Sequence, residues 1–279
     1  MPTFLSLLRA GATREQLEEW CREKTQSYAS GAGELVCRVL GKYLMFAATG
    51  DTALTPHLAL NGIWESWITM AIANHVKPGM RCMDVGACYG YYSVLMADIV
   101  GKHGAVQAWE PVWGKAVLAN VDINGFDVEV RSALIGTTGG EYEFWMPPGH
   151  FNAGNIKLSE CVSRLSASHL SRVPMHKPAP EAWDFIKIDV EGAEADVWEA
   201  LAGVREQSPN LTVCMEFTPS EHEKPGQFLA KLVEDGFELG TVGHDGVPRS
   251  ISLEEALVPD TGGFRMLWLK GGASAPETR

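Results

Sequence analysis

Apolar and polar positions follow two periodicities along most of the chain, from about residue 62 onward. Short apolar runs, typical of buried strands, lie at residues 81–87, 105–111, 128–136, 183–194, 211–217, 237–243 and 264–270. Stretches with apolar residues at helical spacing lie between them, at residues 63–76, 91–101, 114–125, 195–204 and 225–236. Strands that alternate with helices predict an α/β fold with a parallel sheet covered on both faces. No helical pattern separates the last two runs, so these strands should pair antiparallel at one edge. A hairpin strand is expected at residues 141–146.

Residues 1–55 differ from this pattern. Thr13 and Gln16 form a capping-box sequence before a helical stretch, and residues 33–48 have apolar positions at helical spacing. A segment rich in turn-forming residues follows at 49–62. We therefore predict three parts, which are a helical appendage at 1–55, a main domain at 56–272 and a disordered tail at 273–279. The second helix is too apolar on one face to stand alone, so it should pack on the main domain or on a second copy in a homodimer.

The composition narrows the classes of partner. The chain has 35 acidic and 23 basic side chains, a net charge of −12, whereas nucleic-acid binding depends on many Lys and Arg contacts to phosphates. We expect no nucleic-acid partner and a neutral or cationic small molecule instead. The chain start lacks the features of a signal peptide, and no stretch approaches the roughly 18 apolar residues of a membrane-spanning helix. The six cysteines form no CxxC pair. These features predict a cytoplasmic protein with reduced thiols, no membrane association and no structural zinc.

Two segments at strand ends have the residue types of a nucleoside site. Asp84–Ser93 follows a strand and opens a helix, where ligands bind in an open parallel sheet. Its glycines, Gly86 and Gly90, allow a tight turn, but their GxxxG spacing differs from the GxGxxG of dinucleotide binders and favours a ligand without phosphate. Glu110 ends the next strand, before Pro111, where a carboxylate can accept hydrogen bonds from two ribose hydroxyls.

A third segment has charged residues where apolar ones are expected. Alternate residues of a strand share a face, so Lys187, Asp189 and Glu191 should point the same way. A strand covered on both faces is normally apolar, and three ionisable groups there are costly unless they pair or take part in chemistry. Glu216, on the next strand, can belong to the same cluster. Two interpretations remain open, a catalytic group and a structural ion-pair cluster.

Together these three segments resemble the FkbM family of S-adenosylmethionine-dependent methyltransferases. The resemblance extends from about Gly62 to Phe217, and its most diagnostic part is the motif IKIDVEGAE at residues 186–194. Asn120 and Asn124 also fit the family pattern, as does the segment 132–136. The family usually has Thr-Leu-Asp before the motif, and residues 161–182 contain no such triplet, a difference that concerns the acceptor pocket rather than the cofactor site.

The resemblance implies a Rossmann-like class I methyltransferase fold, with a seven-stranded, mostly parallel sheet and an antiparallel last strand. It implies S-adenosyl-L-methionine as the cofactor, with its methionine part over Gly86–Gly90, its ribose on Glu110 and its adenine near Ser132 and Ala133. The expected cofactor-binding residues are Glu65, Asp84, Gly86, Ala87, Cys88, Gly90, Tyr91, Tyr92, Ser93, Glu110, Pro111, Ser132, Ala133, Asp189 and Val190.

The family also implies methyl transfer, often to a hydroxyl of a sugar or natural product. An alcohol must lose its proton during or after attack, so a nearby carboxylate is required. Asp189 and Glu191 are the candidates, with Lys187 orienting them or holding the acceptor oxygen. We expect the front segment near the acceptor entrance or at a dimer contact.

Several alternatives stay open. The acceptor can be the nitrogen of a peptide or amino group, and a nicotinamide-dependent oxidoreductase or a non-catalytic binding protein on the same fold is further possible. Asp189, Glu191 and Glu216 could hold a divalent ion, but the adjacent Lys187 argues against it, so no metal is expected. His222 is expected to be a solvated loop residue rather than a base. Cys88 is expected to fill space rather than act as a nucleophile.

Overall fold

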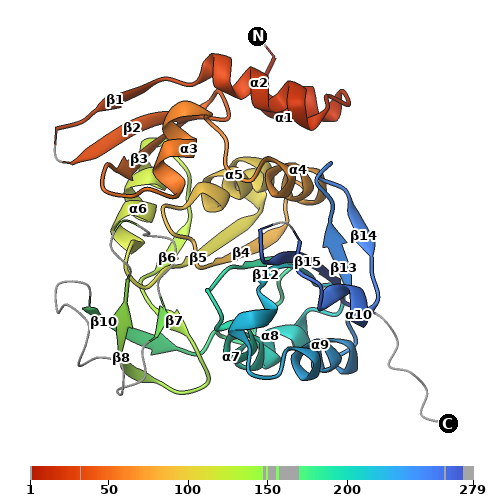
Figure 1. Ribbon diagram of the computed structural model, residues 1–279. Coiled ribbons are helices and arrows are strands. Elements are labelled where there is room, and N and C mark those ends of the chain that lie inside the picture. The colour runs from red at the N-terminus through yellow and green to blue at the C-terminus, as the bar shows by residue number, and fades with distance from the viewer. Residues whose placement is uncertain are drawn as a thin grey trace.

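The computed structural model describes residues 2–31, 33–146, 149, 155–156, 170–260 and 262–272. Over these residues the largest sheet has eight strands in the order β14-β13-β15-β12-β11-β4-β5-β6 (Figure 1). Five adjacent strands, β12 to β6 in that order, run parallel. The strands are β4 (Arg81–Val85), β5 (Ala105–Trp109), β6 (Glu129–Arg131), β11 (Phe185–Ile188), β12 (Thr212–Phe217), β13 (Gly240–Val242), β14 (Pro248–Ser250) and β15 (Arg265–Lys270).

The end of the chain departs from the sequence expectation in one respect. β13 and β15 pair antiparallel, as predicted, but not at the edge. Instead β15 is inserted between β12 and β13 and is antiparallel to both, and the short β14 forms the edge. The predicted pair is not the edge itself because the three-residue β14, which had no recognisable apolar run, pairs with β13 on its outer side. The predicted α/β fold is confirmed, with a mostly parallel sheet and an antiparallel last strand.

Helices cover both faces of this sheet and close two separate apolar cores (Figure 1). α4 (Ser66–His75), α5 (Tyr91–Val100) and α6 (Gly114–Ile123) cover one face, and the one-turn η1 (Gly101–His103) follows α5. α7 (Glu194–Ala200), α8 (Ala202–Gln207), α9 (Pro225–Glu234) and α10 (Leu253–Ala256) lie on the other side, where η4 (Pro219–Glu221) precedes α9. In β11, Phe185 belongs to the first core and Ile186 to the second. Lys187 therefore shares the face of Phe185, toward α4 and α5.

Residues 33–48 do not form the predicted helix. They form β2 (Glu34–Val39) and β3 (Tyr43–Ala48), an antiparallel hairpin that also pairs with β1 (Ser27–Ala29). Along β3 buried and half-buried residues alternate, which is a period of two. A continuous apolar run does not distinguish this period from a helical one, and the helical prediction failed for that reason. The two helices before it, α1 (Phe4–Arg9) and α2 (Arg14–Lys24), include the predicted capping box of Thr13 and Gln16.

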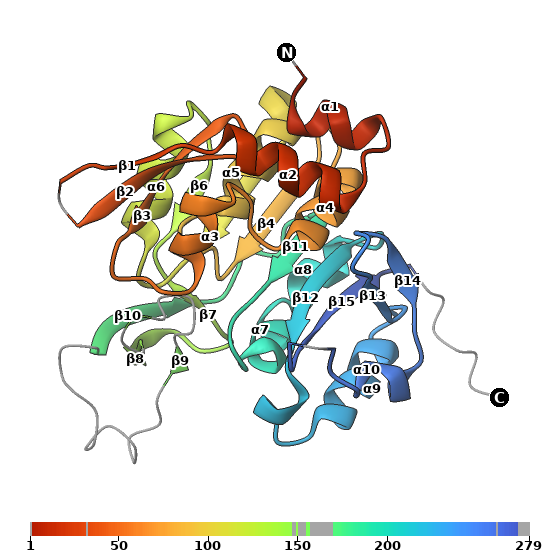
Figure 2. The same cartoon turned by 45° about the horizontal axis from the view of Figure 1, so that its top comes forward.

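The front segment is part of the main core rather than an appendage. α3 (Leu54–Leu60) spans the predicted boundary at residue 55, and Leu17 and Met45 belong to the same apolar cluster as the sheet residue Cys82. Asn120 of α6 and Asn124, the C-cap residue of this helix, hydrogen-bond the backbone of β3. The side chain of Asn120 bonds to both the N–H and the C=O of Phe46, and that of Asn124 bonds to those of Leu44. Figure 2 shows the hairpin lying beside α6 and α3, with α2 at one end of it.

A second, four-stranded sheet lies at the end of the main sheet near β6 (Figure 2). It contains β7 (Leu134–Ile135), β8 (Gly140–Trp145), β9 (Asn155–Ile156) and β10 (Leu170–His176). The predicted strand at 128–136 is therefore two strands, because the chain leaves the main sheet after Arg131 and enters the second one at Leu134. The predicted hairpin strand is β8, which pairs antiparallel with β9 and β10. The tail at 273–279 and Cys161 lie outside the described residues. Within them, every helix is too short or too polar to cross a membrane.

Candidate active site

The turn after β4 brings together the first and third sequence segments. Gly86 has a φ of +80°, and a Cβ built there would lie 1.8 Å from the carbonyl oxygen of Asp189. Only glycine fits this contact, because every other residue would collide with a neighbouring backbone. The two loops are therefore packed backbone to backbone at the carboxyl end of the sheet.

Charged side chains lie side by side on the middle strands. Lys187 of β11 is in register with Asp84 of β4, and its side chain is 2% exposed. Its ammonium lies 2.8 Å from Oδ2 of Asp189 and 4.8 Å from the ring centre of Tyr92. The expectation that Lys187 pairs with a carboxylate is thus confirmed, as an unpaired buried ammonium would cost several kcal/mol.

Three carboxyl groups meet beside this ion pair. One oxygen from each of Asp189, Glu191 and Glu216 lies within 4.8 Å of the other two. Burial and neighbouring carboxylates raise the pKa of Glu191 to about 8 and that of Glu216 to about 10. Burial also raises the pKa of Glu65 to about 7, against the opposing effect of Lys187. A divalent cation could fit the spacing of the three oxygens, but nothing beyond the spacing indicates one, and the expectation of no metal stays a prediction.

These carboxyl groups line a cavity of about 520 Å³, which we call the acidic cavity. Its walls come from α2, α3, α4, α5 and the ends of β11 and β12. Aromatic side chains of Trp64, Trp67 and Phe264 form part of its surface, and Glu65 hydrogen-bonds the hydroxyl of Tyr92 at 2.8 Å. This volume lies in the range of small-molecule sites.

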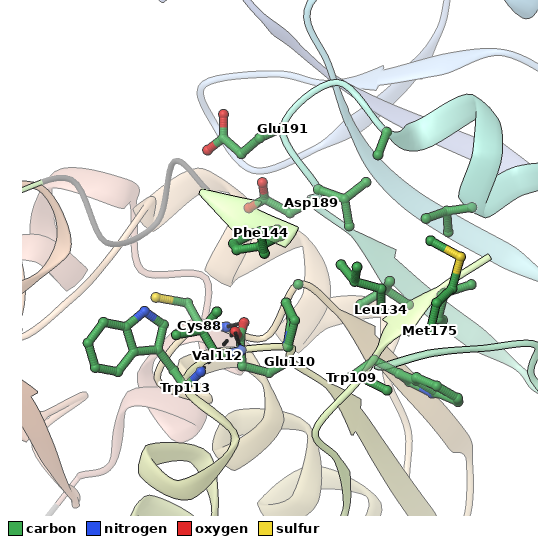
Figure 3. A pocket seen from close by; sticks show the side chains of 18 of the residues that line it. Cys88, Trp109, Glu110, Val112, Trp113, Leu134, Phe144, Met175, Asp189 and Glu191 are labelled. Atoms are coloured by element: carbon green, nitrogen blue, oxygen red, sulfur yellow. Dashed lines mark hydrogen bonds between the residues drawn. The ribbon is translucent and has the colours of Figure 1, made fainter. Parts of the chain in front are cut away.

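A narrower cavity of about 100 Å³ lies on the other side of the same loops, and we call it the apolar cavity. Figure 3 shows Asp189 and Glu191 on one side of it and Trp109 and Trp113 on the other. The two cavities share four lining residues, Gly86, Cys88, Asp189 and Glu191. The carboxylates thus stand where the cavities meet.

Glu110 lies in the apolar cavity, with 6% of its surface exposed. Its carboxylate accepts hydrogen bonds from three backbone N–H groups, those of Cys88, Val112 and Trp113, at 2.8 to 3.0 Å (Figure 3). A carboxylate offers about four acceptor positions, so about one remains for a ribose hydroxyl. The simultaneous grip on two hydroxyls that the sequence suggested would require one of these backbone bonds to open.

The other expected cofactor residues divide into two groups. Those that line a cavity, besides the residues already placed, are Ala87, Tyr91, Tyr92, Pro111, Ala133 and Val190. Asp84, Gly90, Ser93 and Ser132 line neither cavity. Asp84 is 1% exposed and accepts a hydrogen bond from the hydroxyl of Ser93 at 2.6 Å, so it faces Lys187 rather than a ligand. The sequence pattern assigned most of the segment Asp84–Ser93 to the cofactor. Neighbouring side chains of a strand point to opposite faces, so some of them point into the protein interior instead.

Other lining residues had no clear signal in the sequence. Arg14, Glu18 and Arg22 of α2 reach the acidic cavity, and their spacing of four on one helical face was the only hint. Phe144 and Met175 of the second sheet reach the apolar cavity. These residues lie outside the three segments assigned to the site, so only the tertiary arrangement identifies them.

His222 contradicts its prediction as a solvated loop residue. Its side chain is 5% exposed, and its Nε2 lies 3.0 Å from Oε2 of Glu194. The ring stacks on Phe228 and packs against Phe217. A loop position near strand ends does not determine burial, and here two aromatic rings cover the imidazole. Cys88 is consistent with a non-nucleophilic role, because burial and Glu110 raise the pKa of its thiol well above the usual range.

The two cavities fit the cofactor that the sequence resemblance implies. The aromatic and aliphatic walls of the apolar cavity suit a flat base, and Glu110 keeps an acceptor position for a hydroxyl. The carboxylates at the junction suit the positive charge of a sulfonium. Glu110, Ala133, Val190 and the turn at Gly86 would hold S-adenosylmethionine.

Comparisons with known proteins give one family match and several similar solved structures. Residues 84–239 match the methyltransferase FkbM domain. Among solved structures, similar ones include a ribosomal protein L11 methylase from Lactobacillus delbrueckii subsp. bulgaricus, with 14% identity, 74% of this chain and 77% of that chain covered, and a TM-score of 0.41. Another is a SAM-dependent O-methyltransferase from Thermotoga maritima, with 14% identity, coverages of 76% and 66%, and a TM-score of 0.39. A SAM-dependent methyltransferase from Aquifex aeolicus has 16% identity, coverages of 70% and 83%, and a TM-score of 0.36.

No curated protein matches the sequence. The family assignment therefore rests on the FkbM domain, which includes the Gly86 turn, Glu110 and the Lys187–Glu194 segment. Since this match covers residues 84–239 of 279, the protein belongs to the FkbM methyltransferase family and is an S-adenosylmethionine-dependent methyltransferase.

Proposed function

We propose that this methyltransferase acts on a hydroxyl of a small molecule, such as a sugar or natural product, bound in the acidic cavity. The observation that carries the proposal is the position of Asp189 and Glu191, which line both cavities. A group at this junction can contact an acceptor in one cavity and the reacting part of a cofactor in the other.

The carboxylates supply what an alcohol acceptor needs. When bound, S-adenosylmethionine supplies a methyl group already activated on a sulfonium, which leaves as a neutral thioether. The acceptor oxygen forms the new bond to carbon and gives its proton to a carboxylate. General bases work best when their pKa lies near the operating pH, and the pKa of Glu191 is raised to about 8. Glu191 is therefore the base in this proposal.

Asp189 and Lys187 have supporting roles in the same proposal. The ammonium of Lys187 holds Asp189 at 2.8 Å and limits its rotation. This orientation leaves the second oxygen of Asp189 free to accept a hydrogen bond from the acceptor hydroxyl. Fixing the acceptor at about 3 to 3.5 Å from the methyl carbon is the main contribution that a protein makes to such a reaction.

An amino-group acceptor is the second candidate, and the charge of the acidic cavity favours it. Five acidic side chains line the cavity against three basic ones. The acidic residues are Glu18, Glu65, Asp189, Glu191 and Glu216, and the basic residues are Arg14, Arg22 and Lys187. An ammonium on the acceptor would compensate this excess and lower the raised pKa values. The same carboxylates could then take the proton that an amine must lose before it attacks.

The first experiment is calorimetry with S-adenosylhomocysteine, in which we expect binding at micromolar concentrations. Absence of binding at high micromolar concentrations would contradict the assigned cofactor site.

The second experiment incubates the enzyme with S-adenosylmethionine and pairs of acceptors that differ in one group, such as glucose and glucosamine. Mass spectrometry detects the methylated product, and NMR distinguishes an O-methyl from an N-methyl group.

The variant Glu191→Gln tests the base. We expect a rate loss of about 10²-fold or more with S-adenosylhomocysteine binding retained. Glu181→Gln is the control, because Glu181 is exposed and pairs with Arg81 away from both cavities. A Glu191→Gln enzyme with the wild-type rate would refute the role of Glu191.

A further inference from the structure

A buried pair stands behind the carboxylate cluster without lining either cavity. The side chains of Glu194 and His222 are 3% and 5% exposed, and their Oε2 and Nε2 atoms lie 3.0 Å apart. Glu194 is the last residue of the motif IKIDVEGAE and the first of α7. Burying two such polar groups is costly unless they pair with each other or hydrogen-bond their neighbours.

Glu194 holds the loop that carries Glu191. Its Oε1 accepts a hydrogen bond from the backbone N–H of Gly192 at 3.1 Å. Both residues of that turn are left-handed, Glu191 with a φ of +52° and Gly192 with a φ of +91°. A left-handed residue other than glycine costs about 1–2 kcal/mol, so Glu191 keeps this conformation only if the surroundings enforce it.

His222 connects this turn to the next strand. Its ring stacks on Phe228 at a centre-to-centre distance of 5.3 Å and lies 4.9 Å from the ring centre of Phe217. Phe217 directly follows Glu216 at the end of β12. The Glu194–His222 pair therefore joins the loop of Glu191 to the strand of Glu216, which places the two carboxyl groups relative to each other.

We propose that Glu194 and His222 are positioning residues, which hold the left-handed turn at Glu191 and so direct its carboxyl group into the acidic cavity. The inference rests on the proposed role of Glu191 as the base. It assigns no contact with cofactor or acceptor to either residue, because Glu194 acts through the N–H of Gly192 and His222 acts through Glu194.

The test compares variants that are matched in charge. His222→Gln keeps an N–H that can donate to Glu194, whereas His222→Ala removes it. Glu194→Gln keeps an acceptor for the N–H of Gly192, whereas Glu194→Ala removes it. Release of the turn also moves Val190 and Glu191 in the wall of the apolar cavity, which Glu191→Gln does not do. We therefore expect each Ala variant to bind S-adenosylhomocysteine about tenfold more weakly than its Gln partner, which corresponds to about 1.4 kcal/mol.

The pH dependence of methyl transfer is a second measurement. It would not change if Glu194 and His222 only stabilised the fold. Burial raises the pKa of Glu191, and Lys187, Asp189, Glu194, Glu216 and Glu221 are the charged groups that face it. In the Ala variants Glu191 should move into water, so the pH midpoint of methyl transfer should fall from about 8 toward the ordinary range of a carboxyl group. The Gln variants should keep a higher midpoint than their Ala partners.

Asp98→Asn is the control, because Asp98 pairs with Lys42 and accepts a hydrogen bond from Tyr43 on the face of the sheet opposite α7. It should lower the melting temperature without changing the affinity or the midpoint. The proposal is overturned if the Ala variants lose stability in the same way and keep both wild-type values. A wild-type rate in Glu191→Gln would instead refute the role of Glu191 as the base. Failure of the proposed function is therefore distinguishable from failure of this inference.

One measurement needs no variant. Amide hydrogen exchange of the wild type should show strong protection of the Gly192 N–H, which Glu194 holds. Exchange of this amide at the rate of an unstructured peptide would overturn the proposal even if no Ala variant folds.

Discussion

Lys187 keeps its charge in the interior because carboxylates surround it. Burial works to lower the pKa of its ammonium, but Asp189, Asp84 and Glu65 act together to raise it above the ordinary value. Replacement of any one of these carboxylates therefore changes the pKa of Lys187 and of the remaining carboxyl groups. The site behaves as one network in which Lys187 is the central cation.

Asp189→Asn separates a catalytic from a structural role of this network. The substitution keeps the shape and removes the charge, so a catalytic Asp189 predicts a rate loss of about 10²-fold or more with the fold and cofactor binding preserved. Asp98→Asn is a suitable control, since Asp98 bonds to Tyr43 far from the cavities. A lowered melting temperature with activity falling only in proportion to the folded fraction would indicate a structural role.

Glu216→Gln should make the protein less sensitive to alkaline pH. The pKa of Glu216 is raised from 4.5 to about 10 in the folded protein, so the folded state binds this proton more tightly than the unfolded chain. The free energy of unfolding of the wild type therefore falls as pH rises above about 4.5, and glutamine removes this contribution. Denaturant unfolding at about pH 5 and about pH 8 should show the variant gaining stability relative to the wild type at the higher pH. An equal difference at both pH values would contradict the raised pKa.

At the scale of elements, the site depends on two loops that follow neighbouring parallel strands. β4 and β11 are adjacent in the sheet although about a hundred residues separate them in sequence. Their carboxyl ends carry the Gly86 turn and the Asp189–Glu191 loop, which touch through backbone atoms. The contact places both loops at the junction of the two cavities.

Gly86→Ala should therefore be far more damaging than an ordinary glycine substitution. Gly79 provides the matched control, because its φ is +86° and no atom lies within 4 Å of a Cβ built there. We expect Gly79→Ala to cost about 1–2 kcal/mol of strain. Gly86→Ala has the same strain plus a collision with Asp189, so it should lose clearly more stability and nearly all binding of S-adenosylhomocysteine. Similar losses for the two variants, measured by denaturant unfolding and calorimetry, would mean that the loops can separate at little cost.

At the scale of the whole molecule, the front segment completes one of the two apolar cores. Residues of α1, α2, β2 and β3 are buried together with those of α5 and the sheet. The same segment supplies Arg14, Glu18 and Arg22 to the acidic cavity. It thus contributes both to the apolar core and to the wall of the acidic cavity.

Deletion of residues 2–50 should therefore abolish soluble expression. The deletion would expose the buried residues of α4, α5 and α6 and remove the hydrogen-bonding partners of Asn120 and Asn124. Soluble yield, circular dichroism and calorimetry with S-adenosylhomocysteine measure the effect. A soluble truncated chain that binds this ligand with full-length affinity would show that the remaining residues form an independent domain.

The sequence by itself determined the α/β class, the positions of most strands and helices, and the three segments of the site. Strand and helix periods are local properties, and glycine or carboxylate residues at strand ends are readable one at a time. It also predicted that Lys187 pairs with a carboxylate, because an isolated buried charge is too costly in any fold.

The tertiary structure decided the rest, because the missing information lies in contacts between distant segments. Residues 33–48 became a hairpin, since the partners that cover its two faces, including α6, are encoded elsewhere in the chain. The burial of His222 depends on Phe228 and Glu194, and the inward direction of Asp84 depends on its neighbour Lys187 in the sheet. Residue types and their spacing identify candidate chemistry, whereas packing decides which of those groups face a ligand and which support them.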